Sequence, residues 1–306
     1  MIVLLTGENE FEILRERKRI VSEYLKDNDS FGLERLDGED LDSSRLRDAV
    51  LQLPFLVSKK LVIITKPFVS KPTCEALLNI YKQIPDEIDV MLVDSKADKR
   101  TKLFKELSAG KMVQEFVALK GSSLEKWVTT YTVEHGSSIL QADARHLIDR
   151  VGVDQMRLAR EIEKLAYDEH IDSNRIDVLT DQSLRNTVFD LLDKTFASKT
   201  TEALRMYDDL LANKTDPNEV LALVGWQLHA IALVKYAGEG SSADIASKTG
   251  LHPFVAGKII YVARRLSAEQ IKTSISSALR TDIAIKTTNV DTADAVRVLL
   301  LELSSL

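Results

Sequence analysis

Residues 1–14, "MIVLLTGENEFEIL", join a short apolar run to a glycine turn and then to a helical pattern. The run at residues 2–5 is typical of a buried strand. After the turn, apolar pairs recur at helical spacing as far as Leu25, which predicts an amphipathic helix over residues 8–26. A strand, a glycine turn and a helix in this order open many nucleotide-binding α/β domains. The first residues therefore predict an α/β fold.

The same alternation continues to about residue 118. Further strand-like runs are "KLVIIT" at 60–65, "DVMLVD" at 89–94 and "MVQEFVAL" at 112–119, with a shorter run inside "GLERLDGED" at 32–40. Helical patterns separate these runs, and one of these helices is predicted to end at Leu53, just before a proline. Alternating strands and helices favour a mostly parallel sheet that is covered by helices.

Beyond residue 118 the strand-like runs stop and one helical pattern follows another. A loop is expected at "GEGSSADIASKTG", residues 238–250, because glycine and serine cluster there. We therefore predict the α/β plus all-α class, with an α/β domain at 1–118, a small helical domain at 119–183 and a larger helical domain at 184–306.

The composition of the chain excludes several classes of function. The chain has 306 residues, is 44% hydrophobic and carries a formal net charge of −6, so any contact with DNA has to be local. The one cysteine, Cys74, excludes a disulfide framework and a four-cysteine zinc site, and it fits a reducing cytoplasm. We expect no signal peptide and no membrane span, hence a cytoplasmic protein with no membrane partner.

The glycine turn lacks the residues that bind a nucleoside triphosphate. A phosphate-binding loop needs a second glycine, a lysine and a Ser or Thr in register. Here Gly7 is followed by Glu8, Asn9, Glu10, Phe11 and Glu12. The three carboxylates would repel a triphosphate, so we predict no bound cofactor and no ATP hydrolysis. The alternative is an ATPase with an atypical nucleotide site.

The other residues that could carry chemistry do not form a recognisable site. The five histidines are scattered without the spacing of metal ligands. Cys74 has no histidine near it in the sequence, so a structural role is favoured. Asp94 and Asp98 follow a predicted strand, and we expect both to lie in a solvated loop. No catalytic residue and no metal ligand is predicted.

Two segments, residues 96–111 and 257–265, are rich in lysine and arginine. Basic helical faces are usually just solvated, yet each segment is also a candidate surface for phosphate groups. The candidate contacts to DNA or to another subunit are Lys99, Arg100, Lys102, Lys258, Arg264 and Arg265.

The stretch "LQLPFLVSKKLVII", residues 51–64, places large apolar side chains at a turn. Pro54 disfavours helical geometry at the residue before it, so Phe55 and Leu56 are expected in a short connection before the next strand. From the residues alone, burial beneath the sheet and exposure for a partner are equally open. Burial of each side chain in a partner pocket would contribute roughly 1.5–3 kcal/mol.

The order of these features resembles the AAA+ clamp-loader architecture, and within it the delta-subunit family of bacterial DNA polymerase III. The resemblance spans nearly the whole chain. It is carried by "LLTGENEFEI", "LPFLVSKKLVII", "MRLAREIEKLA", "VFDLLDKTFASKTTEAL", "LHPFVAGKIIYVAR" and "ALRTDIAIKT". It implies a degenerate P-loop AAA+-like domain, a small helical lid domain and a helical collar. It also implies that sister subunits hydrolyse the ATP.

The resemblance further implies a clamp-binding plug formed by Phe55 and Leu56, with Leu53 as a supporting contact. The family pattern is Leu-Phe, whereas the order here is Phe-Leu. Arg157 falls in the place of a nucleotide-sensing arginine, and without a P-loop lysine we expect it to be a surface or interface residue. The implied partners are the beta sliding clamp, the gamma/tau and delta-prime subunits, and primed DNA.

Overall fold

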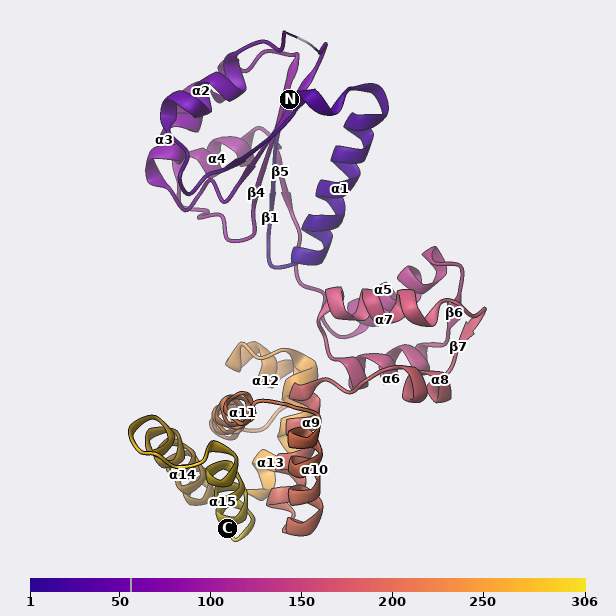
Figure 1. The fold of residues 1–306 in the computed structure, drawn as a ribbon, viewed down its shortest axis with the longest axis vertical. Coiled ribbons are helices and arrows are strands. Elements are labelled where there is room, and N and C mark those ends of the chain that lie inside the picture. Colours follow the sequence, from indigo (N-terminus) through magenta and orange to yellow (C-terminus); the bar gives the residue numbers. More distant parts are fainter. Residues whose placement is uncertain (56) are drawn as a thin grey trace. The chain divides into compact units, whose positions relative to one another are not determined.

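The computed structural model describes residues 1–55 and 57–306 (Figure 1). The chain divides into two compact units, Met1–Leu119 and Lys120–Leu306. Each unit has its own buried core and is described by itself.

The first unit is built on a five-stranded sheet in which every strand pair is parallel, in the order β2-β3-β4-β1-β5. The strands are β1 (Ile2–Thr6), β2 (Leu33–Asp37), β3 (Lys60–Thr65), β4 (Ile88–Asp94) and β5 (Val113–Glu115). The central strands are apolar on both faces, as expected for a parallel sheet with helices on each side. The predicted parallel α/β fold is confirmed.

The helices are divided unequally between the two faces of this sheet. Helix α1 (Glu10–Asp27) lies on one face, whereas α2 (Ser43–Leu51), α3 (Lys71–Ile80) and α4 (Lys102–Ala109) lie on the other (Figure 1). The core on the α1 side is correspondingly small and contains Ile13 and Tyr24 from the helix with Ile63 and Met91 from the sheet. The other core is much larger. Two 3-10 turns, η1 (Ser30–Gly32) and η2 (Tyr81–Gln83), complete the unit.

Helix α2 ends earlier than the sequence predicts. Its last residue is Leu51, and the backbone of Gln52 is already extended (ψ 120°) while its N–H still bonds to the carbonyl of Asp48. Leu53 therefore lies outside the helix, and the prediction that the helix ends at Leu53 is wrong. Proline restricts the residue before it, which here is Leu53, and the helix has already ended two residues earlier, at Leu51.

The second unit is mainly helical. Its helices are α5 (Ser122–Glu134), α6 (Gln141–Val151), α7 (Gln155–Leu165), α8 (Ser173–Leu179), α9 (Leu184–Phe196), α10 (Thr200–Ala212), α11 (Pro217–Ala237), α12 (Ser242–Thr249), α13 (Pro253–Arg265), α14 (Ala268–Thr287) and α15 (Thr292–Ser304). Helix α11 is long and apolar enough to cross a membrane by length and composition (mean hydropathy 1.5), but its buried side chains lie at the centre of the helical core.

Two short strands contradict the expectation that strands stop at residue 118. Strands β6 (Ser138–Ile139) and β7 (His170–Ile171) pair in parallel, and the N–H of Ser138 donates to the carbonyl of Glu169 at 3.0 Å. Ile139 and Ile171 are both buried. Strands of two residues are too short to leave an alternating pattern in the sequence, so periodicity could not predict them.

The expected loop at residues 238–250 is also wrong in part, because it contains helix α12. Ser241 and Asp244 form a capping box in which each side chain accepts the other residue's backbone N–H. Gly250 ends the helix with φ +73°, a left-handed conformation that glycine adopts without strain. The glycines and serines that suggested a loop are in fact the two ends of a helix.

Removal of the capping box should destabilise the second unit. We expect Ser241→Ala to lower the free energy of unfolding by about 0.5–2 kcal/mol, because the N–H of Asp244 loses its acceptor. Ser276→Ala, at an exposed position inside α14, is the matched control and should change stability by less than about 0.5 kcal/mol. Chemical denaturation measures the free energy of unfolding of both variants, and hydrogen exchange of the α12 amides measures local opening of the helix. Equal effects of the two substitutions would contradict a stabilising role for the cap.

Candidate functional site

The loop between α2 and β3 exposes two apolar side chains. Phe55 is 98% exposed and Leu53 is 62% exposed. The loop leads into the first residue of β3, so it lies at the amino edge of the sheet (Figure 1). Leu56, the second residue of the predicted plug, lies outside the described residues. An isolated surface phenylalanine needs no explanation, but this one stands at the tip of a loop beside a second apolar residue.

The end of this loop is fixed firmly to the sheet. The backbone N–H of Lys60 donates to the carbonyl of Glu87 at 2.9 Å, which joins the loop to the residue before β4. The Lys60 ammonium bonds to the carbonyl of Ala49 at 2.7 Å and pairs with Glu34 at 2.8 Å. Lys59 pairs with Asp89 at 3.1 Å. The loop is therefore anchored at its carboxyl end, a few residues after the exposed side chains.

A third exposed apolar residue, Phe31, lies in the turn η1 that packs against the same loop. The hydroxyl of Tyr24 donates to the carbonyl of Lys59 at 2.7 Å, which ties the end of α1 to the loop. Gly32 fits so closely that a Cβ there would lie 2.6 Å from the same carbonyl and 3.0 Å from a methyl group of Val57. Phe31 is 85% exposed.

Sequence reasoning missed Phe31. A signal was present in the sequence, because "SFG" at residues 30–32 comes shortly after the helix predicted over residues 8–26 and places a large aromatic beside a glycine, much as Phe55 follows a proline. What the sequence does not contain is the spatial proximity of the two turns, which the contacts of Tyr24 and Gly32 establish.

The opposite, carboxyl edge of the sheet holds the glycine turn after β1. Asn9 caps α1 by accepting the N–H of Glu12 at 3.1 Å, and its own N–H donates to the carbonyl of Phe116 at 3.1 Å. Its side-chain amide donates to the carbonyl of Val117 at 3.3 Å. Gly7 has φ +121°, and a Cβ there would collide with the backbone of Phe116. The turn is therefore filled by the chain itself.

Comparison with known proteins identifies the family. Residues 4–116 match the model of the DNA polymerase III delta subunit, and residues 185–303 match the model of its C-terminal domain. The chain belongs to the DNA polymerase III delta-subunit family. DNA polymerase III subunit delta of Bacillus subtilis is 27% identical over 310 residues, which cover 95% of this chain and 88% of that relative.

The solved structure of the Bacillus subtilis DNA clamp loader delta protein resembles the chain in fold. It has a TM-score of 0.73 and 24% identity, and the match covers 100% of this chain and 95% of that one. The fold class predicted from the sequence, an α/β domain followed by a helical region, is thereby confirmed.

The basic residues near α4 in this delta-family chain are partly neutralised. Lys99 pairs with Glu115 at 2.6 Å, and Arg100 pairs with Asp98 at 2.9 Å. Hydrogen bonds from Arg100 lower the pKa of Asp98 to about 2. Lys102 is exposed and has no ion pair within the described residues. The segment therefore offers fewer free cations to a phosphate backbone than its composition suggests.

The remaining candidate cations lie in the second unit. The Arg157 guanidinium donates to the carbonyl of Asp181 at 3.4 Å and lines a cavity of about 700 Å³ together with Phe254. The Lys258 ammonium lies 4.9 Å from the centre of the Phe254 ring, so the structure brings Arg157 and Lys258 to one region. Arg264 and Arg265 are exposed near the end of α13, and Arg265 lies over the ring of Tyr261.

Asp94 is not in a solvated loop, contrary to the expectation from the sequence. It is only 5% exposed, and its carboxylate accepts the backbone N–H groups of Phe68 and Lys96, both at 3.0 Å. Two such bonds satisfy the buried charge and fix the turns after β3 and β4. No cluster of histidine, cysteine, aspartate and glutamate suited to a metal ion occurs among the described residues.

Cys74 should be chemically inert in the folded protein. Its burial, together with the nearby charges of Asp94 and Asp98, raises the pKa of the thiol to about 11, so the reactive thiolate is scarce at pH 8. We expect a thiol-specific reagent to modify Cys74 much more slowly in the native than in the unfolded chain. The control is Ser108→Cys in a Cys74→Ser background, an exposed position that should react at once. Equal native rates at the two positions would contradict the buried thiol.

Proposed function

We propose that this chain is the subunit of the clamp loader that binds the beta sliding clamp through the amino edge of its sheet and opens the ring. The clamp-binding surface consists of Leu53, Phe55 and Leu56, as the family resemblance implies, and of Phe31 as an additional contact. The observation that carries the proposal is the almost complete exposure of Phe55 at the tip of a loop whose end is anchored to the sheet.

The energetics suit a small apolar anchor. Burial of a phenylalanine or leucine in a partner pocket contributes roughly 1.5–3 kcal/mol, and every 1.4 kcal/mol changes affinity about tenfold. Anchors of this kind dominate interfaces when they enter a desolvated pocket. The contacts of Lys59 and Lys60 reduce the entropy that the loop loses on binding, because its end is already ordered.

The same proposal assigns ATP hydrolysis to sister subunits. A triphosphate at the start of α1 would meet Glu10 and Glu12 in the first helical turn, where their charges oppose it. The backbone N–H groups of Asn9 and Glu12 are already bonded within the chain. The chain acts as a binding protein inside the polymerase III holoenzyme, with no catalytic site of its own and a cytoplasmic location.

The second unit supplies the contacts to the gamma/tau and delta-prime subunits in this proposal. Helix α14 exposes Ile275, Leu279 and Ile283, spaced four residues apart so that they form one apolar stripe. Such a stripe suits a helical collar shared between subunits. The proposed domains are 1–118, 119–183 and 184–306, and primed DNA contacts the exposed Lys102, Arg264 and Arg265.

The amino-edge surface can be tested by clamp binding. We expect Phe55→Ala/Leu56→Ala to weaken binding of the cognate clamp by about two to four decades, and Phe31→Ala to weaken it about tenfold or more. Tyr167→Ala, an aromatic that is 91% exposed in the second unit, is the matched control and should leave the affinity unchanged. Surface plasmon resonance with immobilised clamp measures all three. Wild-type affinity of the double variant would overturn the proposal.

The absence of nucleotide binding can be tested on the isolated chain. We expect calorimetric titration with magnesium-ATP to give no saturable signal up to about 1 mM, the upper end of the usual range of enzyme KM values. Clamp binding by the same sample serves as the control for a folded protein. Saturable binding would instead favour an AAA+ ATPase with an atypical nucleotide site.

A further inference from the structure

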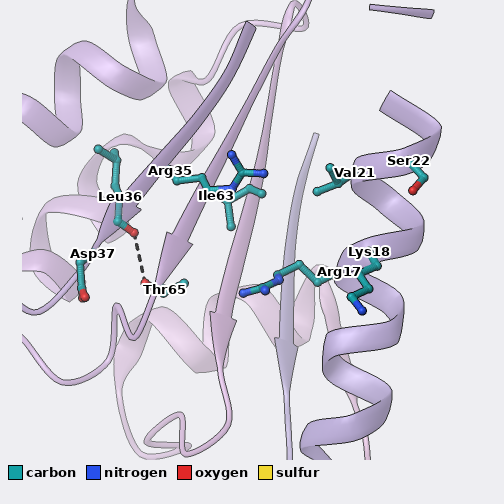
Figure 2. A pocket seen from close by; sticks show the side chains of 9 residues that line it. All are labelled: Arg17, Lys18, Val21, Ser22, Arg35, Leu36, Asp37, Ile63 and Thr65. Carbon is teal, nitrogen blue, oxygen red and sulfur yellow. Dashed lines mark hydrogen bonds between the residues drawn. The ribbon is translucent and has the colours of Figure 1, made fainter. Parts of the chain in front are cut away.

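A cationic groove lies on the α1 face of the sheet, away from the amino-edge surface. It has a volume of about 530 Å³ and is lined by Arg17, Lys18 and Val21 from α1 and by Arg35, Ile63 and Thr65 from the sheet (Figure 2). Figure 2 shows the Arg17 side chain reaching from the helix toward the sheet, while Arg35 and Ile63 lie beside each other on the sheet side. Nothing in the proposed clamp-binding function uses these residues.

The groove exists because one helix cannot cover five strands. Strands about 4.8 Å apart make the sheet roughly 19 Å wide, whereas a helix with its side chains is about 10–12 Å across. Among the described residues of the first unit, α1 is the only helix on this face. It packs over β1, β4 and part of β3, so the carboxyl half of the edge strand β2 remains open.

The side-chain pattern of β2 fits an open face. Side chains alternate along a strand, so Leu33, Arg35 and Asp37 point to one face. Leu33 packs into the core on the α1 side, which assigns Arg35 to the same side, where it is the register partner of Ile63. A charged residue therefore stands where an apolar one would be expected if a helix covered this position.

The three cations of the groove are unpaired. Arg17, Lys18 and Arg35 form no ion pair and no side-chain hydrogen bond within the described residues. By contrast, Arg19 on the same helix pairs with both Glu16 and Glu23.

One acid, Asp37, also lines the groove, and its carboxylate accepts the N–H of Glu39 at 3.1 Å. The hydroxyl of Thr65 donates to the carbonyl of Leu36 at 3.3 Å, as Figure 2 shows. The charged donors of the groove are thus its three cations, in a chain of net charge −6, and Ser22 adds a hydroxyl to the lining.

We propose that this groove binds an acidic peptide segment of a protein partner, with an apolar side chain on Val21 and Ile63 and carboxylates on Arg17 and Arg35. Arginine clusters are suited to this task because the guanidinium fork matches a carboxylate. The apolar floor, without an aromatic residue, favours a peptide over single-stranded nucleic acid. Single-stranded nucleic acid binds by stacking on aromatic side chains, and none of the described residues that line the groove is aromatic.

The test uses fluorescence anisotropy of short labelled peptides with the full chain. The test peptide alternates aspartate and leucine. One control peptide alternates lysine and leucine, and a second alternates aspartate and serine. A short oligothymidylate represents single-stranded nucleic acid. We expect the wild-type chain to bind only the first probe, with affinity that falls as salt rises. The variant Arg17→Glu/Arg35→Glu should bind it about tenfold or more weakly, since attraction becomes repulsion.

The matched control is Arg47→Glu/Lys105→Glu, which makes the same change in net charge at exposed positions on α2 and α4, the helices of the opposite face. It should keep wild-type peptide affinity. Both double variants should keep wild-type clamp affinity, which shows that they fold and separates this proposal from the clamp-binding one. Three results would each overturn the proposal. The acidic probe could fail to bind, both double variants could lose affinity for it equally, or only oligothymidylate could bind in a manner that depends on Arg17.

Discussion

The parallel arrangement of the five strands determines which loops of the first unit meet. In a parallel sheet every connection from a helix to a strand returns to the amino edge, and every connection from a strand to a helix leaves from the carboxyl edge. The turn η1 and the loop after α2 are both of the first kind. Phe31 and Phe55 therefore emerge at one edge, while the turn that would hold a nucleotide lies at the other.

The loop at the amino edge is suited to binding a partner because one end of it is anchored. Exposed aromatic side chains on a flexible loop would lose much of their binding energy to ordering. Here a single carbonyl, that of Lys59, accepts the hydroxyl of Tyr24 and sits close against Gly32, so helix α1, turn η1 and the loop share one junction. At the carboxyl edge, Asn9 makes comparable bonds, but these occupy the backbone N–H groups of Asn9 and Glu12, which a phosphate could otherwise use.

The unequal covering of the sheet has a second consequence. Three helices seal one face, whereas one helix leaves a groove on the other, with Arg35 beside Ile63 at its edge. The amino-acid pattern of β2 predicts only a short strand and does not indicate this groove. The alternation of apolar and charged residues along β2 indicates an open face only when it is known how many helices cover each face of the sheet.

The sequence by itself determined the parallel α/β unit, the helical region after it and the missing phosphate-loop chemistry, because apolar periodicity and loop composition are local properties. It also singled out Phe55. It did not predict the strands of two residues, the helix at Ser242–Thr249 or the burial of Asp94. Only the tertiary structure decided that turn η1, which carries Phe31, lies against the Phe55 loop and that Arg17 and Arg35 line one groove. These residues are far apart in the chain, and the order of strands in the sheet brings them together.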